Sequence, residues 1–115
     1  PDVHLVESDS RKCVFLNEVA LLTNTKVTVH NARIEALRPL SGRVVTARAL
    51  APLVKLLPLA YRHMAKNGQM LFLKGQDVDT ELTAATKCWK MIACHRASLS
   101  DKTGTILQLT EISRV

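Results

Sequence analysis

Aromatic residues, glycine and proline are scarce in this 115-residue sequence, which has one Trp, one Tyr, two Phe, four Gly and four Pro. So little glycine and proline excludes collagen-like and linker sequences. The 47% of apolar residues, well mixed and without repeats, excludes a disordered chain or a repeat array. No apolar run approaches the ~18–20 residues that a membrane-spanning helix needs, so we expect no membrane association. What remains is one modest domain or a part of one.

The cysteines and histidines form no pattern typical of a metal site or a disulfide framework. Cys13, Cys88 and Cys94 are an odd set with no Cys-x-x-Cys, and although His95 follows Cys94 directly, the spacing matches no zinc motif. We therefore expect no metal, reduced thiols and a cytoplasmic protein, because unpaired cysteines are typical of a reducing compartment.

Strand-like and helix-like segments alternate along the chain, which is typical of an α/β fold. Runs of mainly apolar and β-branched residues predict strands at 3–7, 26–30, 44–47, 69–73, 91–97 and 105–112. Helices are expected at 11–22, at 52–64 and after 77, with one helical turn at 34–37. Only the short segment 98–104 joins the last two strands, so we expect these two to be antiparallel.

Polar residues mark the ends of the expected helices. Ser8 or Asp9 can cap the first helix, and Asp77 is expected to cap the last one. Asn67-Gly68 is expected to end the helix between them. The apolar face of the last helix is expected to consist of Val78, Leu82, Ala85 and Trp89.

These elements predict a mostly parallel sheet, covered by helices on both faces, that ends in an antiparallel strand pair. This ending is unusual for dinucleotide-binding domains, but it is how methyltransferases of the Rossmann-like class close their sheet. In open α/β sheets ligands bind at the carboxyl ends of the strands. Glu7, Arg48 and Lys74 each end or follow an expected strand, so they are candidates for a binding site.

Each of these candidates also has a simpler explanation. The Glu7 carboxylate can accept both hydroxyls of a ribose, or it can be an exposed acid that helps to cap the following helix. Arg48 can hold a cofactor carboxylate or an RNA phosphate, or it can be an ordinary solvated side chain, and Lys74 is placed similarly. The residues alone leave these roles open.

Positive charge is concentrated in the middle of the chain. From Arg33 to Lys74 there are eight Lys and Arg residues and a single acid, Glu35, so this stretch carries +7 and the rest of the chain −1. A basic stretch of this kind suits an RNA backbone, although solvation of a surface explains it equally well unless the charges share one face. Aromatic residues are too few for a base-stacking platform.

Four ordered segments resemble the bacterial small-subunit rRNA methyltransferase G family, long called glucose-inhibited division protein B. They read LVESDxRKxxFLxEV at 5–19, VTVHNARIE at 27–35, TARALA at 46–51 and FxKG at 72–75. The similarity runs in order and with fitting spacings from about Val3 to about Gln76, and it weakens toward the C-terminus.

The resemblance implies transfer of a methyl group from S-adenosylmethionine to ring nitrogen 7 of a guanine in 16S rRNA, free or in the small ribosomal subunit. That nitrogen carries a lone pair and no proton, so the reaction needs alignment and no general base. We accordingly expect no catalytic acid or base in this chain, and a monomeric full-length protein.

The resemblance also implies roles for individual residues. Glu7 matches the ribose-binding acid, and Ile34 with Glu35 matches the segment that meets the adenine end of the cofactor. The alternative for that segment is an ordinary helical turn with Ile34 in the core. Arg48 matches the family's Ser-Arg-Ala position, with Ala47 here in place of Ser. We take Glu7, Ile34, Glu35 and Arg48 as candidate cofactor contacts, and Arg33, Arg48 and Lys74 as candidate RNA contacts.

Family members begin with a helical segment and a first strand that leads into a Gly-rich loop. Only six residues precede Glu7, whereas the ribose-binding acid of nucleotide-binding sheets lies about 20 residues past that loop. We therefore expect residues 1–115 to be the C-terminal part of a methyltransferase domain that begins at its second strand. Loss of the first strand would leave two open sheet edges, so we expect the isolated polypeptide to be unstable or to self-associate.

Two other functions fit the same residues. One is half of a different nucleotide-binding α/β enzyme, such as a dehydrogenase, but the final strand pair argues against it. The other is a non-catalytic α/β module that binds RNA through the stretch from Arg33 to Lys74.

Overall fold

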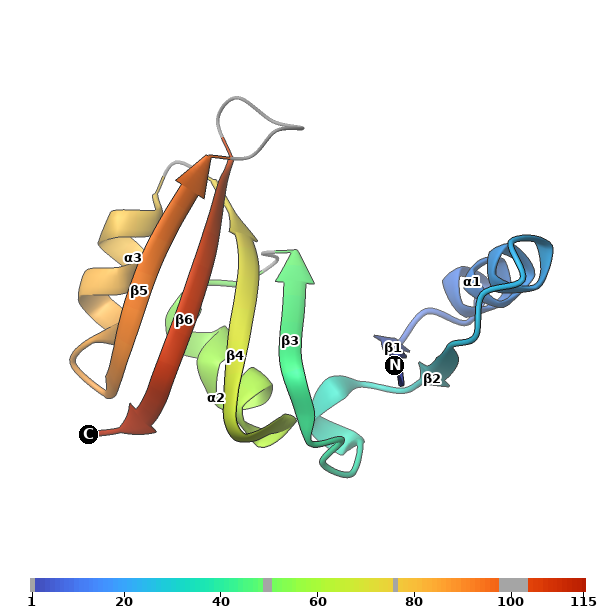
Figure 1. Cartoon of the computed structure of the whole chain (residues 1–115), viewed down its shortest axis with the longest axis horizontal. Coiled ribbons are helices and arrows are strands. Elements are labelled where there is room, and N and C mark those ends of the chain that lie inside the picture. The colour runs from blue at the N-terminus through green and yellow to red at the C-terminus, as the bar shows by residue number, and fades with distance from the viewer. Residues whose placement is uncertain (1, 49–50, 76, 98–103) are drawn as a thin grey trace. The chain divides into compact units, whose positions relative to one another are not determined.

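The computed structural model describes residues 2–48, 51–75, 77–97 and 104–115. These residues form two compact units, Pro1–Arg38 and Pro39–Val115. Each unit has its own sheet, and helices alternate with strands along the chain (Figure 1), so the expectation of an α/β fold is confirmed. No helix in the described part is long and apolar enough to cross a membrane.

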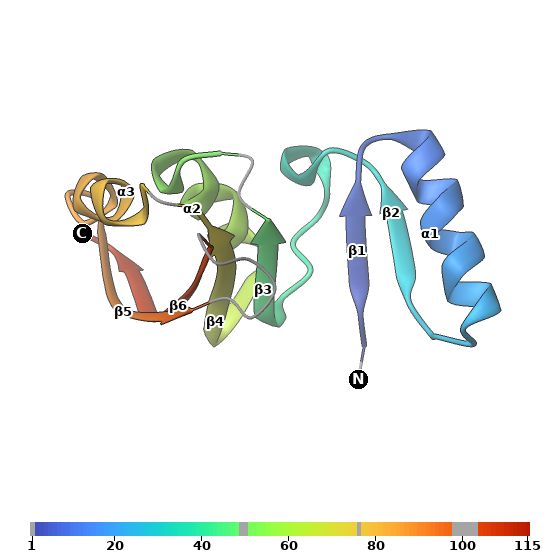
Figure 2. The same ribbon diagram turned by 90° about the horizontal axis from the view of Figure 1, so that it is seen from above.

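The first unit is a strand–helix–strand motif followed by a single turn of 3₁₀ helix. Strand β1 (His4–Glu7) pairs in parallel with β2 (Thr28–Asn31), and helix α1 (Ser10–Leu22) connects them (Figure 2). The 3₁₀ turn η1 (Ile34–Ala36) follows β2. Asp9 caps α1, because its side chain accepts hydrogen bonds from the backbone N–H groups of Arg11 and Lys12 at 2.9 and 3.4 Å. Of the two expected caps, Asp9 is the one observed.

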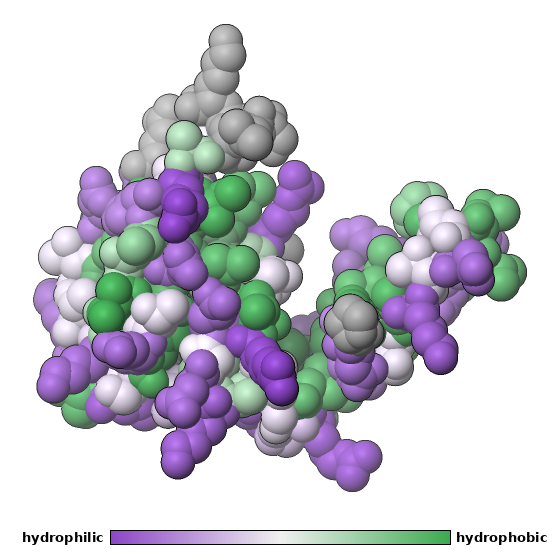
Figure 3. Space-filling model, viewed as in Figure 1, coloured by the Kyte–Doolittle hydropathy of each residue, from purple (hydrophilic) through white to green (hydrophobic). Residues whose placement is uncertain are grey.

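Helix α1 leaves most of its apolar residues exposed within this structure. Phe15, Leu21 and Leu22 are 63%, 82% and 86% exposed, and Cys13 is the one buried residue of the helix. Figure 3 shows hydrophobic side chains at the surface over α1. The reason is that the four-residue strands β1 and β2 offer little sheet surface on which the helix can pack.

The second unit is a four-stranded sheet with two helices. Its strands are β3 (Gly42–Arg48), β4 (Met64–Lys74), β5 (Trp89–Ala97) and β6 (Thr105–Arg114), in the order β3-β4-β6-β5. β3 and β4 are parallel, whereas β6 runs antiparallel to both β4 and β5. The antiparallel ending is therefore confirmed, with β6 inserted between β4 and β5. The connection 98–104 lies outside the described residues except for Gly104.

Helices α2 (Leu53–Arg62) and α3 (Val78–Ala85) lie on the same side of this sheet (Figure 2). In the described part of this unit the two helices cover one face of the sheet (Figure 2). The core forms between these helices and the alternate residues of β4 and β6 that face them. Its largest fully buried side chains are Phe72, Leu53, Leu57, Met70, Leu107 and Leu109.

Three local expectations are wrong in the second unit. Asp77 precedes α3 but makes no side-chain capping bond. Trp89 begins β5 instead of extending the apolar face of α3; it is buried against the edge of Tyr61, with the guanidinium of Arg114 4.7 Å above its ring. Asn67-Gly68 lies inside β4, because α2 already ends at Arg62.

The early end of α2 coincides with a buried histidine. The backbone N–H of His63 bonds to the Ala60 carbonyl, and its ring Nδ1 accepts the Leu40 N–H at 3.2 Å. The chain then enters β4 with an irregular stretch, since Met64 pairs with Gly42 while Gln69 pairs with Val44. This bulge contains Asn67 in the left-handed region, at a φ of 62°.

Gly68 has no room for a side chain in this bulge. A Cβ atom there would lie 2.9 Å from the Ala65 carbonyl oxygen and 3.0 Å from that of Arg43. We predict that Gly68→Ala destabilises the protein by about 1–3 kcal/mol, the usual cost of overpacking. The measurement is urea unfolding of the protein that contains these residues. Gly75→Ala is the matched control, because nothing lies within 4 Å of its added Cβ; equal effects of the two changes would contradict the prediction.

Candidate functional site

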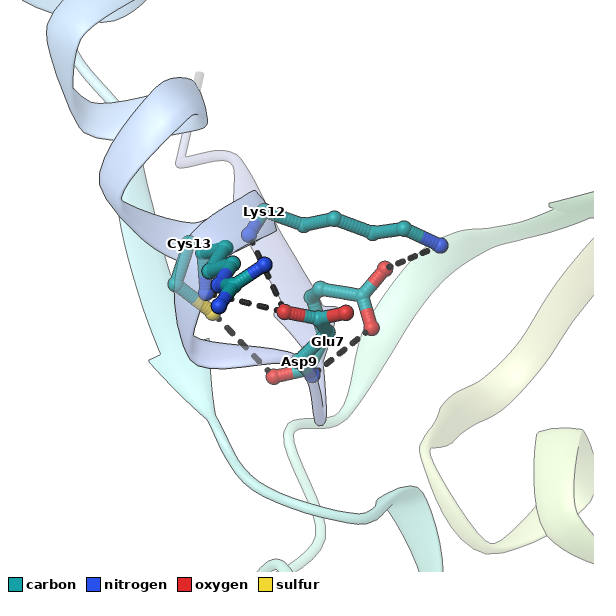
Figure 4. Close-up of polar contacts among 5 residues, drawn as sticks. Glu7, Asp9, Lys12 and Cys13 are labelled. Atoms are coloured by element: carbon teal, nitrogen blue, oxygen red, sulfur yellow. Dashed lines mark hydrogen bonds and ion pairs between the residues drawn. The ribbon is translucent and has the colours of Figure 1, made fainter.

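Glu7 lies at the carboxyl end of β1, and its backbone ties three segments together. Its carbonyl oxygen accepts the Ala32 N–H at 3.1 Å and the Cys13 thiol at 3.2 Å. The end of β1 is thus bonded both to the segment after β2 and to the first turn of α1. These bonds fix the backbone from which the Glu7 side chain extends at the sheet edge (Figure 4).

The Glu7 carboxylate contributes to the turn into α1 and keeps free acceptor capacity. One oxygen, Oε2, accepts the backbone N–H of Asp9 at 3.1 Å, and the other, Oε1, is 4.0 Å from the Lys12 ammonium. The side chain is 28% exposed. Each carboxylate oxygen has two lone pairs, so two hydroxyl groups can still donate to this carboxylate. The helix-capping and ligand-binding roles are therefore compatible.

Ile34 and Glu35 lie at the same edge of the first sheet as Glu7. The last residue of β2, Asn31, is paired with Glu7, and η1 begins three residues later. Ile34 is half-buried, whereas Glu35 is 54% exposed and lies 4.0 Å from the Arg33 guanidinium. Parallel pairing has brought the expected ribose and adenine segments to one edge of this unit.

Arg48 ends β3 at the carboxyl edge of the second sheet, as expected. It pairs in register with Leu73 of β4, and its side chain is exposed. An exposed guanidinium at this edge can form bidentate hydrogen bonds with a carboxylate or a phosphate.

Lys74 is adjacent in register but has a different environment. Its side chain is 2% exposed, and its ammonium lies 2.6 Å from Glu81 Oε1 and 2.8 Å from the Ala51 carbonyl oxygen. A phosphate of RNA does not reach a side chain buried in this way. Lys74 therefore has a structural role and not the expected RNA contact.

Glu81 is the functional candidate that sequence reasoning missed. Its carboxylate joins Lys74 and also accepts the Leu53 backbone N–H at 2.9 Å. In the sequence it is one of two acids in the first turn of α3, which the helix dipole alone explains. Nothing in the sequence marks it as the partner of Lys74, because the burial of that lysine arises only in the folded unit.

Two open hollows lie away from these strand ends. One, of about 520 Å³, is lined by Asn17, Ala20, Leu21, Asn24, Thr25 and Lys26. The other, of about 320 Å³, is lined by Tyr61, Met64, Ala65, Lys66, Asn67 and Ile112. Both involve the amino-terminal approach to a strand, whereas ligands of open α/β sheets bind at the carboxyl ends. No group of three or more His, Cys, Asp and Glu side chains suited to a metal ion occurs in the part of the chain that is described.

Comparison with known families and with known sequences identifies the same group of proteins. A family model described as rRNA small subunit methyltransferase G matches residues 1–110. The chain is 58% identical over 114 residues to the ribosomal RNA small subunit methyltransferase G of Paramagnetospirillum magneticum, covering 99% of the chain and 56% of that relative. Its counterpart in Rhodospirillum rubrum is 50% identical, with 99% and 57% covered. The chain therefore spans a little over half the length of these relatives.

Solved structures share the fold at low sequence identity. M. jannaschii TYW2, determined in complex with AdoMet, superposes with a TM-score of 0.71 at 14% identity, covering 99% of this chain and 58% of that one. The ribosomal protein L11 methylase of Lactobacillus delbrueckii subsp. bulgaricus gives a TM-score of 0.71 at 18% identity, covering 98% and 57%. These similarities show the fold of methyltransferases.

Cys13, beside Glu7, is predicted to be the least reactive of the three cysteines. Desolvation raises the pKa of its thiol, and the carboxylates of Glu7 and Asp9 raise it further, whereas Cys88 and Cys94 are exposed. Because the thiolate is the nucleophile, we expect iodoacetamide at pH 7.5 to modify Cys13 at least about tenfold more slowly than the other two. Peptide mass spectrometry measures the three rates, and urea should make them similar. Equal rates in the native protein would contradict the prediction.

Proposed function

Since the chain belongs to the rRNA small subunit methyltransferase G family, we propose that the protein containing it methylates ring nitrogen 7 of a guanine in 16S rRNA, using S-adenosylmethionine. The family match carries the rRNA substrate, and the structural observation that supports a nucleoside cofactor is the partly exposed Glu7 carboxylate at the carboxyl end of β1. We further propose that it acts in the cytoplasm, as a monomer, on free rRNA or on the small ribosomal subunit. Membership of this family sets aside the alternative of a dehydrogenase half.

Glu7 suits the ribose of the cofactor. A carboxylate that keeps acceptor capacity can receive two neighbouring hydroxyls, and the Asp9 N–H holds it in place from the other side. The same N–H bond restricts the rotamers of the side chain, which lowers the entropic cost of binding. Glu7 would thus be positioned before the cofactor arrives.

Ile34 and Glu35 suit the adenine end. The half-buried Ile34 offers an apolar surface, and the exposed turn η1 offers backbone groups, at the edge where Glu7 ends β1. A contact through the backbone does not depend on side-chain identity, whereas one through the Glu35 carboxylate does. The Arg33–Glu35 pair is exposed on both sides, so a ligand can displace it at little cost.

Exposed basic residues suit the RNA. In the second unit Arg43, Arg48, Lys55, Arg62 and Lys66 are exposed, and Arg33 is 78% exposed in the first. Contacts of this kind with phosphates position an RNA without reading its bases. Lys74 is left out of this set because it is buried.

The cofactor supplies a methyl group on a positively charged sulfur, which guanine nitrogen 7 can attack with its lone pair. The chain then has to align the two partners and keep positive side chains away from the sulfonium. The Arg48 guanidinium would bind the cofactor carboxylate or an RNA phosphate at the sheet edge. The absence of a proton on nitrogen 7 removes the need for a base from this chain.

The remainder of the longer protein would supply further strands. In the described part β1 pairs with β2 alone, and β3 pairs with β4 alone, so each has an edge to which a strand can add. We propose that a first strand and its Gly-rich loop lie outside these residues and hold the methionine part of the cofactor. Self-association of the isolated polypeptide stays a prediction on the same basis.

Glu7→Ala is predicted to weaken cofactor binding by about 1–3 kcal/mol, or about 5- to 150-fold in Kd, which is the usual cost of losing charged hydrogen bonds. Calorimetric titration of S-adenosylmethionine into the longer protein measures it. Asp9→Ala is the matched control, because it removes the α1 cap and should lower stability without changing Kd. Unchanged affinity in Glu7→Ala would contradict the ribose assignment. If RNA binding then proves salt-dependent and indifferent to cofactor, the non-catalytic RNA module is favoured.

Arg48→Ala is predicted to reduce methyl transfer by about tenfold or more, because a charged hydrogen bond is worth about 1.5–3 kcal/mol. Single-turnover and steady-state kinetics on 16S rRNA measure the loss. A higher KM for RNA with an unchanged cofactor Kd indicates a phosphate contact, and a higher cofactor Kd indicates the carboxylate. Lys87→Ala removes an exposed positive charge after α3 and is the control. Unchanged kcat/KM in Arg48→Ala would contradict a role for this residue.

A further inference from the structure

We propose that the buried ion pair between Lys74 and Glu81 is a clamp that positions Arg48 by fixing the end of β4, beside which Arg48 lies. The inference rests on the function proposed above, in which Arg48 acts at the sheet edge. Lys74 and Glu81 would therefore be positioning residues, which touch neither cofactor nor RNA.

The clamp joins three elements at the carboxyl edge of the second sheet. Lys74 ends β4, and Glu81 lies in the first turn of α3. The two side chains meet at 2.6 Å, with exposed fractions of 2% and 22%. The Lys74 ammonium also donates to the Ala51 carbonyl, and the Glu81 carboxylate also accepts the Leu53 N–H. Each charge is thus satisfied by its partner and by a backbone group.

Both backbone groups belong to the short stretch that starts α2. Leu53 is the first residue of α2, and the N–H groups of a first helical turn lack partners within the helix. The preceding residue, Pro52, makes no side-chain capping bond. Glu81 of α3 therefore supplies the acceptor that the local sequence lacks. Together the two charges hold the carbonyl of residue 51 and the N–H of residue 53.

Arg48 itself is held by strand pairing. It pairs in register with Leu73, the residue directly before Lys74. The Lys74 ammonium bonds to Ala51 and Glu81, so the end of β4 beside Arg48 is anchored to the residues at the starts of α2 and α3. The position from which the Arg48 side chain extends then depends on this anchored end of β4.

The burial of this ion pair is better explained by the backbone positions that it fixes than by a gain in the stability of the protein. Taking two charges out of water is costly, and apolar residues of similar volume often stabilise a protein as well as a buried ion pair does. Apolar side chains would pack here but would leave the Ala51 carbonyl and the Leu53 N–H without these partners. The charged pair therefore fixes the positions of those two backbone groups.

A double-mutant cycle between Lys74 and Arg48 tests the proposal in the longer protein. We expect Lys74→Met to lower kcat/KM for 16S rRNA methylation by no more than Arg48→Ala does, about tenfold, because Lys74 acts through the charged hydrogen bonds of Arg48. In the Arg48→Ala background, Lys74→Met should cause no further loss. A lysine that acts only on the stability of the fold would lower activity by a similar factor in both backgrounds, because its effect would not pass through the Arg48 side chain.

The assays are run at a temperature where urea unfolding shows every variant to be folded. If Lys74→Met does not fold, the double variant Lys74→Met/Glu81→Gln takes its place. It leaves no buried unpaired carboxylate, and the side-chain oxygen of the introduced glutamine can still accept the Leu53 N–H. Lys87→Met is the control for loss of a positive charge, since Lys87 is exposed, and it should leave both backgrounds unchanged.

Each outcome decides between the two proposals. Loss of the Lys74 effect in the Arg48→Ala background supports the clamp. Losses that multiply overturn the clamp and leave the assignment of Arg48 intact. If Arg48→Ala alone has no effect on kcat/KM, the role of Arg48 and the clamp are both overturned, while the ribose role of Glu7 is still judged by its own titration.

Discussion

The parallel pairing of neighbouring strands is the constraint on which the candidate site depends. Two parallel strands end at the same edge of a sheet, so residues far apart in the sequence meet there. Pairing of Glu7 with Asn31 brings the β1 carboxylate to the edge from which η1 departs. Pairing of Arg48 with Leu73 places the arginine beside the end of β4. In the second sheet the antiparallel strand β6 adds no carboxyl end to the edge where β4 ends, because β6 begins there, with Thr105 opposite Lys74.

The two units secure their strand ends in different ways. In the first, the Glu7 carbonyl accepts the N–H of Ala32, which follows β2, and the Glu7 carboxylate accepts the N–H of Asp9. In the second, the alternation of β4 turns Met70, Phe72 and Lys74 toward the helices, and the lysine comes where the apolar core stops. A buried ammonium there requires a carboxylate and a carbonyl. Those groups come from Glu81 and Ala51, and so from two other segments of the chain.

Much of the fold could be read from local patterns. The order of strands and helices, the Asp9 cap and the antiparallel ending all follow from periodicity, capping chemistry and loop length, which operate over a few residues. The errors arose where distant residues intervened. Trp89 has the spacing of a helical face but is taken into β5 against Tyr61 and Arg114. Asn67-Gly68 has the composition of a helix stop but forms a bulge, because α2 has already ended before the buried His63.

Local patterns and motifs of adjacent residues were enough for the α/β class, the resemblance to one methyltransferase family and the candidate residues Glu7, Ile34, Glu35 and Arg48. Which charges meet solvent depended on tertiary packing. Arg48 and Lys74 look equivalent as cations at the ends of adjacent strands, yet one is exposed and the other buried. The difference is set by Glu81 and Ala51, whose oxygens contact the Lys74 ammonium only once β4, α2 and α3 have packed together, and by the Leu53 N–H, which bonds to Glu81.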